Sequence, residues 1–262
     1  MKRLAVALTA IAAFTGSAFA ADLPARYTKA PAPVMPVYNW TGFYIFGGGG
    51  GGLWAADQHV QDSITGTPLT IDQRQGGSGW FGTVGIGYDW QFGGKWVAGI
   101  FGDGQFGSIK GTLQDPLFGV TGTLKLEDSW AAGVRVGYLV APNVLSYVNG
   151  GYSGARFSGV TLLDTVTGLP VGGHTDSFNR NGWFVGGGVE NNLDIFGITA
   201  PGWFMKTEYR SAFYDRKSVA ELIDVTNLPT GNSLRFNTWN QTISTSLVYR
   251  FNWGGAPIQA RY

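Results

Sequence analysis

Seven charged side chains stand singly within stretches that are otherwise made of glycine, aromatic and aliphatic residues. They are Asp89, Asp103, Arg135, Glu190, Lys206, Glu208 and Arg210. Charged residues make up only 13% of the chain, and the acids and bases of this set nearly balance. An unpaired charge in an apolar interior costs on the order of several kcal/mol. These residues therefore predict ion pairing, with Asp103 beside Arg135 and Glu190 beside Lys206 or Arg210.

The two histidines, His59 and His174, are the other residues that could bind a metal or act as a base. Both fall in polar stretches that we expect to be solvated loops, with Asp57 and Asp176 nearby. A metal would need further ligands that converge on them, and nucleophilic catalysis would need a histidine beside a nucleophile. The chain has no cysteine, so thiolate ligands, disulfides and a cysteine nucleophile are excluded. We predict no enzyme activity, no metal and no cofactor.

Six consecutive glycines at positions 47–52 invite comparison with a phosphate-binding loop. Such a loop continues into Gly-Lys-Ser/Thr and a helix, whereas Leu53-Trp54-Ala55 follows here. Glycines at this density favour a tightly curved strand in which neighbouring backbones come close.

The elements that carry these residues alternate apolar and polar positions with a period of two, which is typical of a strand with different surroundings on its two faces. In 238–253, Ile243, Leu247 and Tyr249 share one parity, and Thr242, Ser246 and Arg250 share the other. Charged residues fall almost wholly on the parity opposite the aromatic residues. We predict eight such strands: 41–55, 79–92, 95–108, 129–140, 144–157, 182–192, 202–214 and 238–253.

This pattern predicts an all-β fold, an eight-stranded antiparallel up-and-down transmembrane β-barrel with four long extracellular loops. The strands exceed the usual soluble length of about 5–6 residues, and tryptophans, Trp40 and Trp54 among them, cluster at strand ends as membrane-interface girdles do. Connections also alternate in length, which places both termini in the periplasm. The long ones are 56–78, 109–128, 158–181 and 215–237. Because alternation alone fits a soluble sandwich too, that alternative stays open.

A short repeat recurs in the four long connections, at 64–68, 120–124, 166–170 and 225–229. In each, Gly or Asn follows a threonine where a tight turn would need a positive φ angle. We interpret each repeat as the tip of a hairpin that extends a strand pair beyond the membrane.

The N-terminus has the features of a secretory signal peptide over residues 1–20: a basic start, an apolar stretch and a small-residue cleavage site between Ala20 and Ala21. A proline-rich periplasmic linker is predicted over 21–39, and the barrel over 40–262. The formal net charge is +1, and it becomes −1 once Lys2 and Arg3 are removed. The absence of a basic surplus argues against nucleic acid as a partner.

Five short motifs along the chain are distinctive: Ala21-Asp22-Leu23-Pro24, Asn39-Trp40-Thr41-Gly42-Phe43-Tyr44, Gly186-Gly187-Gly188-Val189-Glu190, Lys206-Thr207-Glu208-Tyr209 and Val248-Tyr249-Arg250-Phe251. With these motifs the chain resembles the small outer-membrane β-barrel proteins of alphaproteobacteria, the RopB-type porin-like family. The resemblance spans the chain. It implies a cell-surface barrel of eight strands, often labelled porin-like or a surface antigen, and it carries no catalytic residues. The chain departs from the pattern at its C-terminus, where Tyr249, Phe251, Trp253 and Tyr262 are all candidates for the membrane-insertion signal.

Together these features predict an outer-membrane protein with a structural and surface-interaction role, whose interior is plugged by paired charges. The alternative is a narrow passive porin-like channel for small solutes, lined by the same charges. An enzyme and a secreted sandwich are the remaining classes. The expected partners are outer-membrane lipid, lipopolysaccharide and the outer-membrane assembly machinery, and the sequence leaves the oligomeric state open.

Overall fold

A computed structural model describes residues 38–115, 119–198 and 200–251 of the chain. Ala20, Ala21, Trp253 and Tyr262 lie outside these residues, as do the predicted signal peptide and most of the linker. The described part is almost entirely β-structure. Its elements are β1 (Gly42–Asp62), β2 (Gln73–Phe92), β3 (Trp96–Asp115), β4 (Val120–Ala141), β5 (Val144–Phe157), β6 (Val160–Asp164), β7 (Pro170–Thr175), β8 (Phe178–Asn192), η2 (Leu193–Phe196), β9 (Trp203–Tyr214), β10 (Lys217–Ile223) and β11 (Pro229–Phe251).

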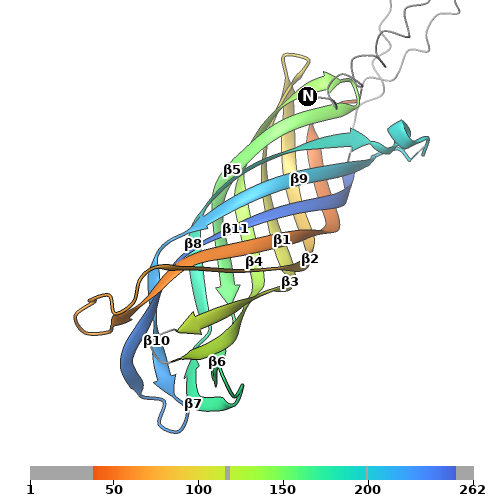
Figure 1. The fold of residues 1–262 in the computed structure, drawn as a ribbon. Helices are drawn as coiled ribbons and strands as arrows, with labels where there is room; N and C mark the ends of the chain where they lie inside the picture. Colours follow the sequence, from red (N-terminus) through yellow and green to blue (C-terminus); the bar gives the residue numbers. More distant parts are fainter. Residues whose placement is uncertain (1–37, 116–118, 199, 252–262) are drawn as a thin grey trace, which may run out of the picture. The chain divides into compact units, whose positions relative to one another are not determined.

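The long strands pair in an antiparallel circuit that returns to its start (Figure 1). The order is β1, β2, β3, β4, β5, β8, β9 and β11, and β11 pairs again with β1 from Phe43↔Phe251 to Asp62↔Asn232. We call this circuit the strand ring. The prediction of an all-β antiparallel fold is confirmed, and each predicted segment overlaps one ring strand. No helix among the described residues is long and apolar enough to cross a membrane.

Side chains of the ring alternate between its two faces. On β2 the outward Trp80 is 80% exposed, whereas the inward Thr83 and Asp89 are buried. The outward apolar band ends in aromatic residues on both sides. The turn-side edge, near the β2–β3 and β4–β5 turns, carries Phe43, Trp90, Phe92, Trp96, Tyr138, Trp203, Tyr249 and Phe251, and the hairpin-side edge carries Trp80, Phe106, Trp130, Tyr152, Trp183, Phe213 and Trp239.

Two of the tryptophans assigned to the girdle lie inside the ring instead. Trp40 and Trp54 are 0% and 1% exposed. Trp40 contacts Phe204, with ring centroids 5.0 Å apart, and the Trp54 indole nitrogen donates to the Ile109 carbonyl at 3.2 Å. The prediction failed here because a strand-end tryptophan can belong to either parity, and only the pairing register decides which.

Beyond the hairpin-side edge the two faces exchange character, in a part of the fold that we call the extension. Many of its inward residues are apolar, including Val60, Leu113, Leu124, Leu162 and Leu234, and Gln58, Asp115 and Glu221 are buried among them. Its outward residues are polar, including Arg74, Lys110, Lys125 and Arg235. This is the arrangement of a soluble sheet around its own core, so the apolar outward band ends where the extension begins.

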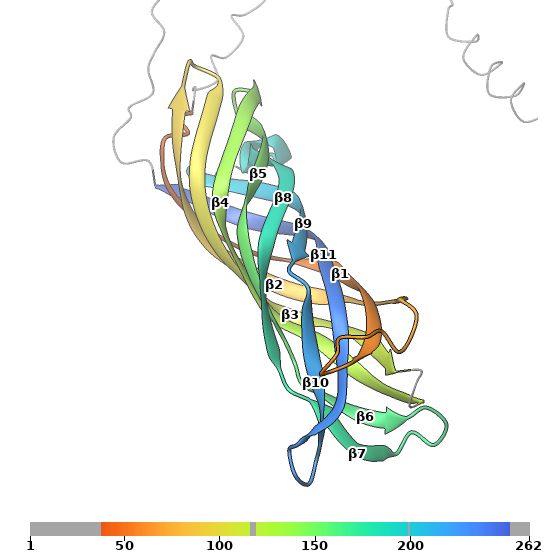
Figure 2. The same cartoon turned by 90° about the vertical axis from the view of Figure 1, so that its left-hand side faces the viewer.

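The predicted long loops are mostly strand. β1 continues to Asp62 and β3 to Asp115, while the third connection holds β6 and β7 and the fourth holds β10. Figures 1 and 2 show β6, β7 and β10 at the end of the ring opposite the β2–β3 and β4–β5 turns. The four long connections therefore contain paired strand residues, as hairpins that extend the strand pairs would.

Three of the four repeats do form hairpin tips with a positive φ angle: Gly66 (69°), Gly168 (68°) and Asn227 (55°). At two tips an aspartate fixes the turn. The Asp62 carboxylate accepts from the Ile64 and Thr65 amides, and Asp164 accepts from the Val166 and Thr167 amides. The same hydrogen bonds lower the pKa of both carboxyls. The repeat at 120–124 is an exception, because it lies within β4.

The glycine run belongs to β1, where β11 and β2 flank it closely. A Cβ on Gly50 would lie 2.1 Å from the Ile243 carbonyl oxygen, whereas a Cβ on Gly51 would approach nothing nearer than 3.8 Å. Glycine is therefore needed at the inward position by close backbone approach.

Gly50→Ala should destabilise the refolded protein by about 1–3 kcal/mol, because the new methyl group overlaps the backbone of β11. Gly51→Ala, in the same run, is the matched control and should leave stability nearly unchanged. Urea unfolding of both variants measures the difference. Equal midpoints for the two variants would contradict the close approach.

Candidate functional site

The ring interior holds two clusters of ionised side chains, and the first contains Asp89, Arg135, Glu190 and Arg250. Arg135 donates to Asp89 through Nε at 2.9 Å and also through Nη2, and to Glu190 through Nη1 at 3.0 Å. Arg250 Nη2 lies 2.8 Å from Asp89 and 2.7 Å from Glu190. All four are buried. Two guanidinium groups thus alternate with two carboxylates, and the formal charges cancel.

The second cluster contains Asp103, Lys206, Glu208 and Arg210, with the Tyr147 hydroxyl. Arg210 binds Asp103 through both terminal nitrogens, at 2.9 and 2.7 Å, and donates to Glu208 at 2.7 Å. Lys206 Nζ lies 3.5 Å from Glu208, to which the Tyr147 hydroxyl donates at 2.8 Å. This cluster too is buried and formally neutral.

Alternate strands supply the two clusters. Asp89, Arg135, Glu190 and Arg250 come from β2, β4, β8 and β11, and the second cluster comes from β3, β5 and β9. Asp103 and Arg210 therefore face each other across the ring from strands four places apart in the circuit. Inward side chains of small barrels stack in such alternating layers.

The structure brings the predicted charges together, but with other partners than the sequence suggested. Asp103 pairs with Arg210 and not with Arg135. Glu190 pairs with Arg135 and Arg250, and not with Lys206 or Arg210. The prediction paired adjacent strands, whereas inward side chains in a narrow ring reach across it. The prediction left Arg250 out of the set of interior charges. Its position on the polar face of the last strand could have identified it.

Aromatic rings fill the space around the clusters. The Arg250 guanidinium lies 4.6 Å from the Trp40 ring centroid and 4.9 Å from that of Tyr44, and Lys206 Nζ lies 3.4 Å from that of Phe46. Arg250 also donates to the Trp40 carbonyl at 3.2 Å. These cation–π contacts stabilise buried cations and occupy volume that water would otherwise fill.

The interior also carries neutral polar groups. Ser129 donates to Gln105 at 3.3 Å. The Asn149 amide, Asn240 Oδ1 and Ser246 Oγ are buried and have no hydrogen-bond partner among the described residues. Buried polar atoms normally bond to protein or ordered water, and two of these residues lie beside the charges: Asn149 is the register partner of Arg135, and Ser246 is the register partner of Lys206.

Both histidines lie in strands, not in the loops to which the sequence assigned them. His59 is in β1, with its Nδ1 2.7 Å from Asp72, and His174 is in β7, with its Nδ1 2.7 Å from Asp224. Each pair ties two parts of the extension together. The described residues contain no group of three or more His, Cys, Asp or Glu side chains placed to hold a metal.

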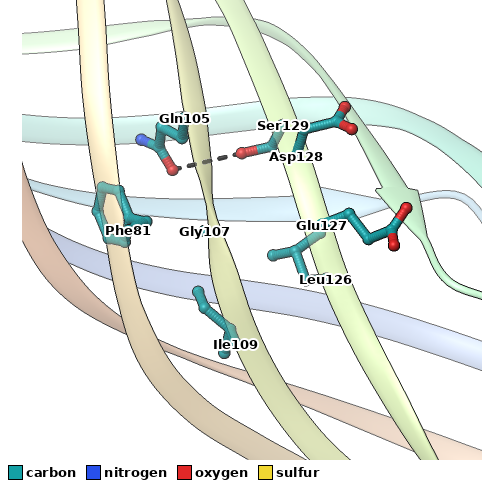
Figure 3. Close-up of a pocket in the computed structure, with 8 residues that line it drawn as sticks. All are labelled: Phe81, Gln105, Gly107, Ile109, Leu126, Glu127, Asp128 and Ser129. Atoms are coloured by element: carbon teal, nitrogen blue, oxygen red, sulfur yellow. Dashed lines mark hydrogen bonds between the residues drawn. The ribbon is translucent and has the colours of Figure 1, made fainter.

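A small pocket opens where the pairing of β3 with β4 is interrupted (Figure 3). The register shifts between Phe106 and Ile109, and Glu127 has no partner residue on β3 or β5. Leu126 and Ser129 are both inward, so this bulge reverses the parity of β4 and places Glu127 and Asp128 side by side. Figure 3 shows both carboxylates on one side of β4, away from Phe81 and Ile109. The pocket carries no catalytic arrangement.

Arg135→Ala should destabilise the protein by about 3–5 kcal/mol, because it leaves two buried carboxylates with one cation. Arg156, whose Nε lies 3.6 Å from Glu127 on the exposed outer face, is the matched control. Arg156→Ala should cost about 0–1 kcal/mol. Urea unfolding checks both values, and a loss below 1 kcal/mol or so for Arg135→Ala would contradict the interior network.

The extension should lose stability as pH rises. Burial and a hydrogen bond with Asp115 raise the pKa of Glu221, on β10, from 4.5 to about 8. Between these two pH values the folded state therefore holds a proton on Glu221 that the unfolded chain releases. The stabilisation that comes from this bound proton is fully present below pH 4.5 and is lost as pH rises through about 8. Hydrogen exchange of β10, corrected for intrinsic rates, should show less protection at about pH 9 than at about pH 6. Glu221→Gln should abolish this difference and Glu127→Gln should keep it. Equal pH dependence in Glu221→Gln and wild type would contradict the assignment.

Comparison with known proteins agrees with this geometry. The family model described as outer membrane protein beta-barrel domain matches residues 6–251. The 31 kDa outer-membrane immunogenic proteins of Brucella melitensis and Brucella suis are each 30% identical to the chain over 259 residues, covering 94% of this chain and 99% of the relative.

Among solved structures, outer membrane protein OprG from Pseudomonas aeruginosa has a similar fold. Its TM-score is 0.52 at 11% identity, with 81% of this chain and 98% of that chain covered. At this identity the likeness shows the fold alone. The match over residues 6–251 and the Brucella relatives confirm the resemblance noted in the sequence, and the chain belongs to the outer-membrane β-barrel proteins of alphaproteobacteria, located in the cell outer membrane.

Proposed function

We propose that the strand ring is an eight-stranded transmembrane barrel whose interior is plugged by the two charge clusters. Its role is structural and surface-directed: it holds the extension outside the cell, with both termini in the periplasm. The signal peptide over 1–20 and the linker over 21–39 belong to the same proposal.

The observation that carries this proposal is the set of ion pairs that cross the ring. Arg210 on β9 reaches Asp103 on β3, and Arg135 on β4 joins Asp89 on β2 to Glu190 on β8. A barrel of eight strands is only wide enough for its side chains to fill. Opening a water path would require these buried charges to separate, at a cost of about 3–5 kcal/mol for each broken pair.

The extension supports the surface-directed part of the role. Its three hairpin tips hold Ile64, Val166 and Val225 at 92%, 91% and 92% exposure. These three exposed tips are the part of the extension to which the proposal assigns contact with something outside the molecule. The Brucella relatives are named as immunogenic proteins, which fits display of such hairpins at a cell surface.

A role without catalysis is supported by the interior chemistry. Each charge of the two clusters is met by an opposite charge, and both histidines are held by aspartates in the extension. Outer-membrane lipid, lipopolysaccharide and the outer-membrane assembly machinery are the proposed partners. Of the candidate insertion residues, Tyr249 and Phe251 lie on β11 at the turn-side edge.

A narrow diffusion channel is the second candidate. The buried polar atoms of Asn149, Asn240 and Ser246 favour it, because they add unpartnered hydrophilic groups to the interior that holds the charge clusters. In a channel, the same charges would set ion selectivity.

Refolded wild-type protein should show little or no steady conductance in planar lipid bilayers, because the paired charges fill the barrel. Asp103→Ala/Arg210→Ala removes a neutral pair and its volume, and should raise conductance. Thr207→Val, at an outward hydroxyl that contacts Thr245 at 3.1 Å, is the control and should behave as wild type. Large, reproducible single-channel conductance steps in the wild-type protein would contradict a plugged interior and favour the diffusion channel.

A further inference from the structure

Two lysines face each other on the outer surface just beyond the hairpin-side aromatic edge. Lys110 on β3 and Lys125 on β4 are direct register partners. Their neighbours Ile109, Leu124 and Leu126 are buried inward, so both lysines point outward. Like charges directly opposite on neighbouring strands destabilise a sheet. Folding alone therefore does not account for this pair.

The nearby acids do not neutralise the lysines. Among the described residues, no Asp or Glu carboxylate oxygen lies within 4.0 Å of the ammonium nitrogen of Lys110 or of Lys125, so neither forms an ion pair. Glu127 is engaged by Arg156 at 3.6 Å, and Asp128 is the register partner of Arg156. Figure 3 shows both carboxylates together on one side of β4. The β4 bulge that gathers them also reverses the parity of the strand, and this reversal turns Lys125 outward.

Hydroxyl groups flank the two lysines along the same row of the sheet. Ser78 on β2 is the register partner of Lys110, and the Ser158 hydroxyl accepts from the Lys125 amide at 3.1 Å. A row of serine, lysine, lysine and serine offers hydroxyl groups that can donate, together with two positive charges, towards a bound anion. Phosphate oxygens are suited to such donors.

The position of the two lysines relative to the apolar band favours a lipid phosphate over a free phosphate ion. Phe106, Trp80 and Trp130 mark the end of the apolar band on β3, β2 and β4. Headgroups occupy about 5–8 Å beyond the hydrocarbon on each side, and lysine side chains extend along a surface to place their ammonium groups at such a level.

We propose that Lys110 and Lys125 form a binding site for the phosphate of an anionic lipid in the outer leaflet, with Ser78 and Ser158 as additional donors. The proposal rests on the proposed membrane orientation but not on the plug, since neither lysine touches the charge clusters. The lipid phosphate removes the repulsion between the two ammonium groups and fixes β3 and β4 where their pairing is interrupted.

The test uses the refolded full chain in a non-ionic detergent, with bis-phosphorylated lipid A as probe, titrated by native mass spectrometry. Wild type should bind it about tenfold or more tightly than the dephosphorylated lipid, as loss of charge-assisted hydrogen bonds implies. Lys110→Ala/Lys125→Ala should lose this preference. Lys95→Ala, in the β2–β3 turn at the opposite edge, should keep it.

Three outcomes would overturn the proposal. One is a double variant that prefers the phosphorylated lipid as strongly as wild type does. Another is inorganic pyrophosphate that competes as well as the lipid, since that would make the site one for soluble anions. The third is a loss of the preference for the phosphorylated lipid in Lys95→Ala that equals the loss in the double variant. If the double variant does not fold, Lys110→Gln and Lys125→Gln are tested singly, and each should weaken the preference. Conductance measured on the same samples reports separately on the plug, so failure of one proposal is distinguishable from failure of the other.

Discussion

The structure depends on how ionised side chains are paired with one another where the strand ring buries them. Asp89, Arg135, Glu190 and Arg250 meet as two cations between two anions, and Asp103, Lys206, Glu208 and Arg210 repeat this balance one layer further in. Because alternate strands supply the two layers, each strand is tied to strands that it does not pair with. Backbone pairing closes the ring around its circumference, and the ion pairs tie it across its diameter.

A second constraint is the change of surroundings at the hairpin-side aromatic edge. Within the band, Trp80 and Ile86 point outward while Thr83 and Asp89 point inward. In the extension the apolar side chains, such as Val60 and Leu234, are inside. The outward face of one continuous strand is therefore apolar in the band and mainly polar in the extension. The exposed tips and the Lys110–Lys125 pair both lie on the extension side of this aromatic edge.

This exchange of faces explains which parts of the fold could be predicted from the sequence. Strand period and parity identified all the ring strands within the apolar band, because contrast between the faces is strongest there. The predicted ends at Ala55 and Ser129 coincide with the places where the contrast weakens or reverses. In β4 the reversal is caused by the bulge at Glu127, which no period-two pattern can follow. The hairpins β6, β7 and β10 were missed because they are short and pair mainly with each other and with strand ends.

The site was predictable in its members but not in its pairing. Parity alone marked Asp89, Asp103, Arg135, Glu190, Lys206, Glu208 and Arg210 as a polar set. Their ion-pair partners depend on strand order and on the stagger between strands, which determine the inward side chains that meet across the interior. Arg250 and Trp40 show the same limit, since Trp40 precedes the first strand and its contacts depend on where that strand begins.

The most direct test of the closed interior uses the fact that the chain has no cysteine. Asn149→Cys places a single thiol at an inward position of β5, and Val148→Cys places one on the adjacent outward position. With the protein in lipid vesicles, a membrane-impermeant maleimide added to both sides should leave the thiol at position 149 unlabelled, and a lipid-soluble maleimide should label the thiol at position 148. Rapid labelling at position 149 by the impermeant reagent would show a water-filled interior and contradict the account.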